Sequence, residues 1–180
     1  MRSSYVQLVG RGHPLDPGYI PEDLTEPKIP FCAPSEDPKR LLRLRAARAA
    51  EGLFERAGQA GLCLYGVSGY RSYARQAKIY GQSSSGYVAP PGCSEHQLGL
   101  ALDVSCPKLG FELVPAFAEM EEGKFLERFG PMYGFILRYP KGKEKITGYA
   151  WEPWHIRYVT KTLALYLSLT GLTLDEYHSL

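Results

Sequence analysis

The alternation of apolar and polar positions predicts several helices interleaved with a few short strands. Residues 38–60 combine helical spacing of leucine with abundant alanine, and this favours a helix that ends near Gly61. Further helices are expected from Ser72 through Tyr80, at 119–129 and at 161–170. Apolar runs predict strands at 62–70, 98–104, 134–140 and 154–160.

Two local patterns refine this picture. The run LGLALDV at 98–104 alternates poorly, which is typical of a central strand buried on both faces. Thr173 and Glu176 match the capping-box pattern at the start of a last helix. The order of elements indicates one domain over residues 1–180 of the α+β class, with a small antiparallel sheet flanked by helices.

Two segments are expected to lack regular structure. Residues 1–37 are rich in proline and turn formers, and we expect an extended arm wrapped on the domain. Its apolar anchors would be Val6, Leu8, Tyr19, Ile20 and Phe31. The stretch 82–96 is a long loop of glycine, serine and proline, and loops of that length inside a compact domain are usually functional.

Composition limits the possible classes of protein. The 180 residues carry 21 basic and 19 acidic side chains, a net charge of +2, which is too mild to indicate a nucleic-acid partner. No apolar stretch is long enough for a transmembrane helix, and the first residues resemble no signal peptide. We therefore expect a monomer that is cytoplasmic if Met1 is the native start, and extracellular or in the cell envelope if the chain is a trimmed form.

The cysteines leave the redox compartment open. None of Cys32, Cys63, Cys93 and Cys106 is in C-x-x-C spacing, which argues against a zinc ribbon or a thioredoxin-like site. Free buried thiols are the simplest interpretation. Cys93 and Cys106 flank one motif, however, and a disulfide between them stays possible.

A candidate metal site is visible in two short segments. Only four histidines are present, and two of them, His96 and His155, lie in turn segments with a carboxylate close by. A catalytic zinc takes three ligands from histidine and carboxylate side chains and keeps one open position, which His96, Asp103 and His155 would satisfy. Glu152 would be the carboxylate that takes a proton from water. Pro153 breaks the regular strand, so that Glu152 and His155 can face one centre despite their odd spacing.

The same residues also admit a purely structural interpretation. An isolated H-x6-D or E-x-x-H spacing occurs often by chance, and a buried aspartate near a strand end is commonly a hydrogen-bonded structural residue. The other two histidines, His13 and His178, lie near the ends of the chain and are expected at the surface.

Three separated motifs make the sequence recognisable. SGYRSYARQ (68–76), PGCSEHQLGLALDV (91–104) and YGFILRYPKGKEKITGYAWEPWHIRYV (133–159) resemble the VanY-type D-alanyl-D-alanine carboxypeptidases. These belong to a zinc peptidase family that also contains L,D-carboxypeptidases and the VanX and VanXY dipeptidases. The motifs occur in the family's order with compatible spacing, and the resemblance extends over nearly the whole chain.

The resemblance implies a role for each motif residue. One zinc ion per chain would be held by His96, Asp103 and His155, with Glu152 as the catalytic base. Arg71 would face the scissile group, where it either stabilises the oxyanion or binds the substrate carboxylate. The cleft would be lined by Gln76, Ser94 and Trp154. For these four cleft residues the alternatives are a surface ion pair for Arg71, a helix-surface position for Gln76, a turn position for Ser94 and core packing for Trp154.

The expected function is hydrolysis by a zinc D,D-carboxypeptidase that removes the terminal D-alanine from peptidoglycan stem peptides or their precursors. An L,D-carboxypeptidase acting on tetrapeptides and a VanXY-like dipeptidase acting on cytoplasmic precursors are the alternatives within the enzyme class. A non-catalytic cell-wall-binding module would be expected to lose a ligand or the base, and this sequence keeps them all.

Overall fold

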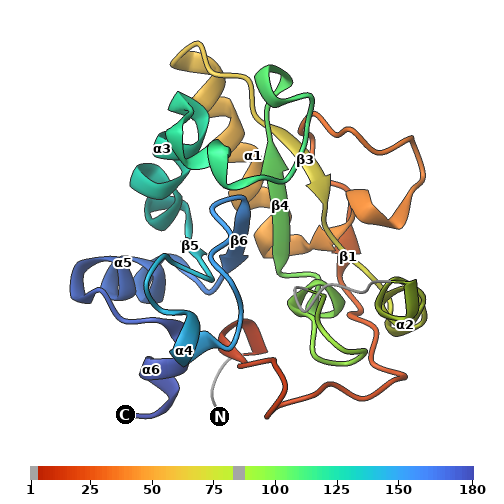
Figure 1. The fold of residues 1–180 in the computed structure, drawn as a ribbon. Helices are drawn as coiled ribbons and strands as arrows, with labels where there is room; N and C mark the ends of the chain where they lie inside the picture. Colours follow the sequence, from red (N-terminus) through yellow and green to blue (C-terminus); the bar gives the residue numbers. More distant parts are fainter. Residues whose placement is uncertain (1–3, 83–87) are drawn as a thin grey trace.

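The computed structural model describes residues 4–82 and 88–180. Its strands are β1 (Leu24–Thr25), β2 (Leu42–Arg43), β3 (Tyr65–Ser68), β4 (Ala101–Ser105), β5 (Phe135–Leu137) and β6 (His155–Tyr158). Its α-helices are α1 (Leu44–Gln59), α2 (Tyr73–Gln82), α3 (Glu121–Phe129), α4 (Glu144–Thr147), α5 (Lys161–Thr170) and α6 (Leu174–His178). A four-stranded antiparallel sheet has the order β3-β4-β6-β5 (Figure 1). Strands β1 and β2 form a second, antiparallel pair. This confirms the predicted class, a small antiparallel sheet flanked by helices.

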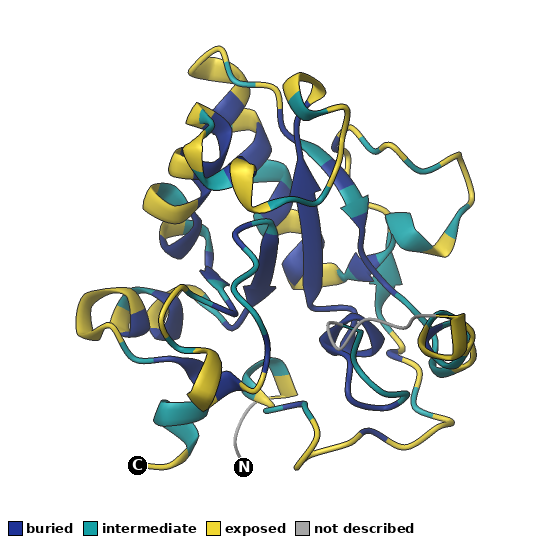
Figure 2. Ribbon diagram, in the orientation of Figure 1, coloured by how far each residue is buried: buried dark blue, intermediate teal, exposed yellow. Residues whose placement is uncertain are grey.

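The register of the main sheet decides which side chains face the core and which face the site. Leu102 on β4 pairs with Ile156 on β6, and both pack in the core cluster that includes Leu53 of α1. Because side chains alternate along a strand, the next pair, Asp103 and His155, lies on the opposite face. All five residues of β4 are buried, as the prediction of a two-sided central strand requires (Figure 2). The sheet therefore presents an aspartate and a histidine side by side from a fully buried position.

The first long helix begins later than predicted. The sequence favoured a helix over 38–60, but α1 starts at Leu44. The carbonyls of Lys39 and Leu41 accept hydrogen bonds from backbone N–H groups that follow β3, and the next two residues pair with β1. Pro38–Arg40 forms a short 3₁₀ helix, and these tertiary hydrogen bonds hold residues 41–43 extended, so they override the helix propensity of the segment. The end is as predicted, because Gly61 follows the helix with a φ of 75°.

The N-terminal arm packs on the domain through partly different side chains from those predicted. Tyr19 and Phe31 contact the main core cluster, and Val6 and Leu8 contact a second cluster around α5. Ile20 is wrong as an anchor, since 64% of its surface is exposed. Its two neighbours, the half-buried Tyr19 and the buried Pro21, face the domain, whereas Ile20 points outward. The buried apolar anchors of the arm include Val9, Leu15 and Ile29.

The remaining predicted elements lie close to their expected positions. The backbone N–H of Arg75 donates to the hydroxyl of Ser72, which supports the predicted start of α2. Helix α5 spans the predicted range, and the predicted capping box at α6 forms between Thr173 and Glu176. Part of the predicted loop at 82–96, residues 83–87, lies outside the described residues. Of the helices in the described ranges, none is both long and apolar enough to cross a membrane.

Candidate active site

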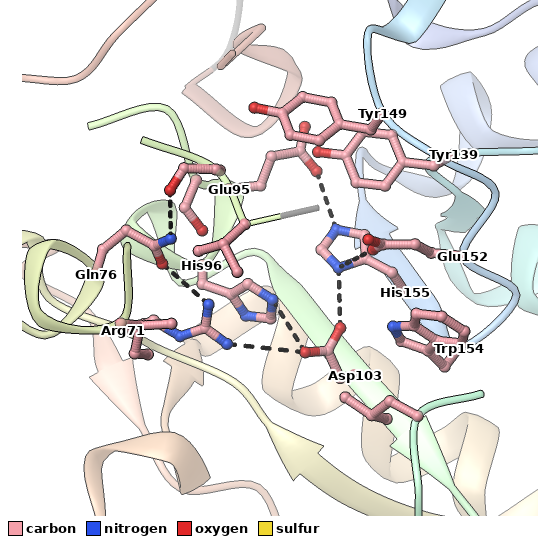
Figure 3. Close-up of a pocket in the computed structure, with 15 residues that line it drawn as sticks. Arg71, Gln76, Glu95, His96, Asp103, Tyr139, Tyr149, Glu152, Trp154 and His155 are labelled. Atoms are coloured by element: carbon pink, nitrogen blue, oxygen red, sulfur yellow. Dashed lines mark hydrogen bonds and ion pairs between the residues drawn. The ribbon is translucent and has the colours of Figure 1, made fainter. Parts of the chain in front are cut away.

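Three side chains from different elements converge on the buried polar face of the sheet. His96 comes from a short 3₁₀ helix, Glu95–Leu98, while Asp103 lies in β4 and His155 opens β6. His96 Nε2 is 3.2 Å from Asp103 Oδ2, and His155 Nδ1 is 2.9 Å from Asp103 Oδ1 (Figure 3). One ligand atom from each of the three lies within 4.8 Å of the others. The structure thus brings together the three residues predicted to bind a metal.

A glycine turn folds His96 back over the strand that follows it. Gly99 ends the 3₁₀ helix in the left-handed region with a φ of 66°, which glycine adopts without a Cβ penalty. A Cβ at this position would lie 2.8 Å from a side-chain carbon of Leu24. The turn explains how the odd spacing between His96 and Asp103 still lets both residues face one point.

Each candidate histidine has one ring nitrogen facing a protein oxygen outside the cluster and the other directed at the centre. His96 Nδ1 lies 2.7 Å from the carbonyl oxygen of Gly69, so the Nδ1–H donates a hydrogen bond to this carbonyl. Nε2 then keeps a free electron pair that can bind a metal. His155 Nε2 lies 3.5 Å from Glu95 Oε2, and its Nδ1 faces the centre. Two imidazoles and one carboxylate with outer partners of this kind are the donor set of a catalytic zinc. The residues present therefore fit this metal.

The charges of the cluster are strongly coupled. Burial lowers the pKa of His96, which favours the neutral ring that a metal requires. Burial would raise the pKa of Asp103, but the two histidines outweigh it and hold this pKa well below its usual range. Burial works against protonation of His155, yet its contacts with Asp103 and Glu95 raise its pKa to about 10. A divalent cation would replace that proton, so metal binding and proton release are linked.

Glu152 faces the same cluster without being part of it. A turn through Pro153, closed by a hydrogen bond from the His155 N–H to the Glu152 carbonyl, directs both side chains inward. Glu152 Oε2 lies 3.9 Å from His155 Nδ1. Burial, reinforced by the charge of Asp103, raises the pKa of Glu152 to about 7, although His155 and Arg71 oppose the shift. A carboxylate with this pKa can both take and return a proton near neutral pH.

Arg71 is fixed beside the cluster rather than at the surface. Its Nη1 donates to Gln76 Oε1 at 2.9 Å, and its Nη2 donates to the Ser68 hydroxyl at 3.2 Å and lies 3.9 Å from Asp103 Oδ2. Gln76 is 1% exposed and donates to the carbonyl of Ala89 at 2.7 Å. The surface alternatives for Arg71 and Gln76 are therefore wrong.

A cavity of about 280 Å³ opens over this cluster. Ser94 and Trp154 both line it, as predicted, although their roles toward a substrate stay predictions. Ser94 also occupies the N-cap position of the short 3₁₀ helix without a capping hydrogen bond from its side chain. The remaining wall is largely apolar or aromatic and includes Ile79, Val88, Leu113, Tyr139 and Tyr149.

Sequence reasoning missed several residues that surround His155. The ring of Tyr139 stacks on His155 with centroids 5.0 Å apart, and Glu95 approaches the same ring. Glu95 is in turn paired with Arg138 and Arg157. A signal existed for these pairs, because an arginine inside each of two apolar strand patterns needs a buried carboxylate partner.

All four cysteines are free thiols. Cys93 and Cys106 are buried, and no disulfide joins them, which agrees with the simpler of the two interpretations. Cys32 and Cys63 are exposed, so the expectation of burial is wrong for these two.

Comparison with known proteins places this site in a family. The family model described as "VanY: D-alanyl-D-alanine carboxypeptidase" matches residues 39–161. The protein YodJ of Bacillus subtilis is 44% identical over 178 residues, which are 94% of this chain and 65% of YodJ. The chain thus spans less than two thirds of that relative. The bifunctional D-Ala-D-Ala dipeptidase and carboxypeptidase VanXYC of Enterococcus gallinarum is 34% identical, with 96% of this chain and 93% of VanXYC covered.

Solved structures show the same relationship. The LdcB LD-carboxypeptidase has a TM-score of 0.92 and 44% identity, with 96% of this chain and 84% of that chain covered. A glutamate-to-alanine mutant of a VanY D,D-pentapeptidase, solved in complex with Zn(II), has a TM-score of 0.78 and 30% identity, with 97% and 99% covered. The family model covers more than half of the chain, and the curated and structural relatives agree with it. The chain therefore belongs to the VanY family of D-alanyl-D-alanine carboxypeptidases.

Proposed function

We propose that this chain is a zinc-dependent carboxypeptidase that removes the terminal D-alanine from peptidoglycan stem peptides. One observation carries the proposal: His96, Asp103 and His155 converge within 4.8 Å, with the Glu152 carboxylate beside them in a cavity. The VanY structure in complex with Zn(II) and the VanXYC relative support it. We further propose that the chain acts as a monomer on the cell wall or on its precursors.

The side chains divide the reaction between them. Zinc bound by the three ligands would supply a Lewis acid that activates water and polarises the scissile carbonyl. Glu152 takes the proton of the attacking water at Oε2 and returns it to the leaving amine. The wall of the cavity is largely apolar or aromatic, which lowers the local dielectric and strengthens each of these electrostatic contacts.

Arg71 is assigned to the developing oxyanion. Its Nη2 lies 3.9 Å from the proposed ligand Asp103, and this proximity supports a role for the guanidinium at the carbonyl under attack. We expect Arg71→Lys to lower kcat/KM by about 10²–10³-fold, mostly through kcat, because lysine keeps the charge but loses the planar fork. Steady-state kinetics on a zinc-loaded variant measure this split.

The matched control is Arg75→Lys, which changes a more exposed arginine on α2 whose Nη1 lies 3.9 Å from Asp37. Both kinetic constants of this variant should stay near wild type. A loss for Arg71→Lys that is confined to KM would instead assign Arg71 to the carboxylate of the substrate.

Alanine release from three synthetic substrates tests the proposed function. We expect the zinc-loaded protein to release D-alanine fastest from a pentapeptide that ends in D-Ala-D-Ala. Release from a tetrapeptide would favour an L,D-carboxypeptidase, the second candidate, which is supported by the TM-score of 0.92 with LdcB. Preference for the free dipeptide would point to a VanXY-like enzyme. A zinc-loaded protein that hydrolyses none of the three would contradict catalysis.

A further inference from the structure

A fully buried glutamate lies directly behind the candidate metal ligands. The side chain of Glu95 is 0% exposed, and those of Arg138 and Arg157 are 1% and 0% exposed. Glu95 Oε1 accepts from Arg138 Nε at 2.7 Å and from Arg157 Nη1 at 2.6 Å. One carboxylate oxygen is thus held by two guanidinium groups, which fixes the position of the whole side chain.

The other oxygen of Glu95 faces a metal ligand. Glu95 Oε2 is buried and has no hydrogen-bond partner, and the same is true of His155 Nε2. These two atoms lie 3.5 Å apart (Figure 3). Buried polar atoms are rarely left unpaired, so two that face each other at this separation need only a small shift to form a bond.

We propose that Glu95 is a positioning residue: its Oε2 accepts the Nε2–H of His155 and so turns Nδ1 of that ring toward the metal. The inference rests on the proposed zinc site and adds to it a residue that contacts a ligand rather than the metal. Outer partners of this kind fix the tautomer and the orientation of a ligating imidazole. Tyr139 holds the ring against rotation out of this plane, since it stacks on His155 at an interplanar angle of 29°.

The two arginines connect this layer to both terminal segments. Arg157 Nη2 donates to the carbonyls of Tyr5 and Gln7 in the N-terminal arm, at 3.2 Å and 2.8 Å. Arg138 makes a two-pronged contact with the carboxylate of Asp175 in α6. The arm and the last helix therefore support the orientation of a metal ligand from outside the cavity.

The competing explanation is that Glu95 only neutralises the two arginines. That role predicts a loss of stability but no effect on the metal in a folded protein. The positioning role predicts that Glu95→Gln, once folded, binds zinc about 10–100-fold more weakly than wild type. Competition with a chromophoric chelator measures the affinity, and circular dichroism verifies the fold.

Glu122→Gln is the matched control. Glu122 is also a buried glutamate, 1% exposed, and its Oε1 lies 3.1 Å from the ammonium group of Lys108. This variant should lose stability but keep the zinc affinity of the wild type. If Glu95→Gln does not fold, Glu95→Asp keeps a negative charge between the arginines but withdraws the oxygen from His155, and the same loss of affinity is expected.

Nitrogen-15 NMR of the zinc-loaded wild type requires no variant. The proposal expects His155 to carry its proton on Nε2, shifted downfield and slow to exchange. A proton on Nδ1, or an unchanged zinc affinity in folded Glu95→Gln, would overturn it. Failure of the proposed function is distinguishable, because a wild type that binds zinc but hydrolyses no alanyl peptide leaves the affinity comparison intact. A wild type that binds no zinc would overturn both.

Discussion

Glu152→Ala is expected to keep one zinc ion per chain and to lose turnover by about 10²–10⁴-fold in kcat, the usual contribution of a general acid–base residue. The carboxylate lies 3.9 Å from His155 Nδ1, close enough to reach a water at the metal, but it is not one of the three clustered ligands. Removal of this side chain should therefore abolish proton transfer and spare metal binding. Release of alanine from the preferred peptide and metal analysis of the same sample measure the two effects.

The pH profile gives a second measurement of the same residue. Glu152 acts as a base only when it is deprotonated, so kcat/KM should fall as the pH drops through its pKa. Burial raises that pKa to about 7 in the metal-free protein, and a bound cation lowers it. The acid limb is thus expected below pH 7.

Glu144→Ala is the control for Glu152, because it removes an exposed glutamate from α4 on the same connection between β5 and β6. Its kinetics should match those of the wild type. Near-normal hydrolysis by Glu152→Ala would show that another group is the base, and loss of zinc from that variant would place Glu152 among the ligands.

The clustering of His96, Asp103 and His155 was predictable from the sequence, because few side chains in the chain can bind a metal and the motifs resemble those of a known family. With four histidines in the chain, His96 and His155 stood out by their turn segments and neighbouring carboxylates. The backbone reasons were partly visible too, since Pro153 implied the irregular turn that now directs Glu152 and His155 to one centre. Local sequence carried that information, and the structure adds the cross-strand pairing of Asp103 with His155.

What the sequence could not supply were contacts between distant segments. The start of α1 was predicted too early, because the non-α-helical conformation of 38–43, a 3₁₀ turn followed by extended residues, depends on hydrogen bonds to residues that follow β3. Glu95 was passed over as a motif neighbour of His96, since its importance lies in Arg138 and Arg157, 43 and 62 residues away along the chain. A buried charged side chain needs an oppositely charged partner, and which residue is that partner depends on how the chain folds.

Asp103→Asn should have the largest effect on the metal itself. Asparagine keeps the shape but removes the anionic ligand that faces His96 at 3.2 Å and His155 at 2.9 Å. Loss of an outer hydrogen-bond partner of a ligand typically weakens metal binding by about 10–100-fold. We expect the loss of zinc affinity in Asp103→Asn to exceed this range, and turnover to fall with it. Dialysis against a chelator followed by metal analysis measures the stoichiometry, and competition titration measures the affinity.

Thermal unfolding separates this loss from simple destabilisation. Zinc at about 1,000 times its dissociation constant stabilises the folded wild type by about 4.1 kcal/mol, and the variant should lose most of that increment. The control is Asp23→Asn, which changes a residue of the N-terminal arm and breaks its 2.7 Å ion pair with Arg43 of β2. This variant should keep the zinc-dependent shift in Tm. One tightly bound zinc in Asp103→Asn would contradict the site. Since Asp103 is the member of the cluster that faces both histidines and Arg71, its charge couples metal binding, ligand protonation and the position of the arginine.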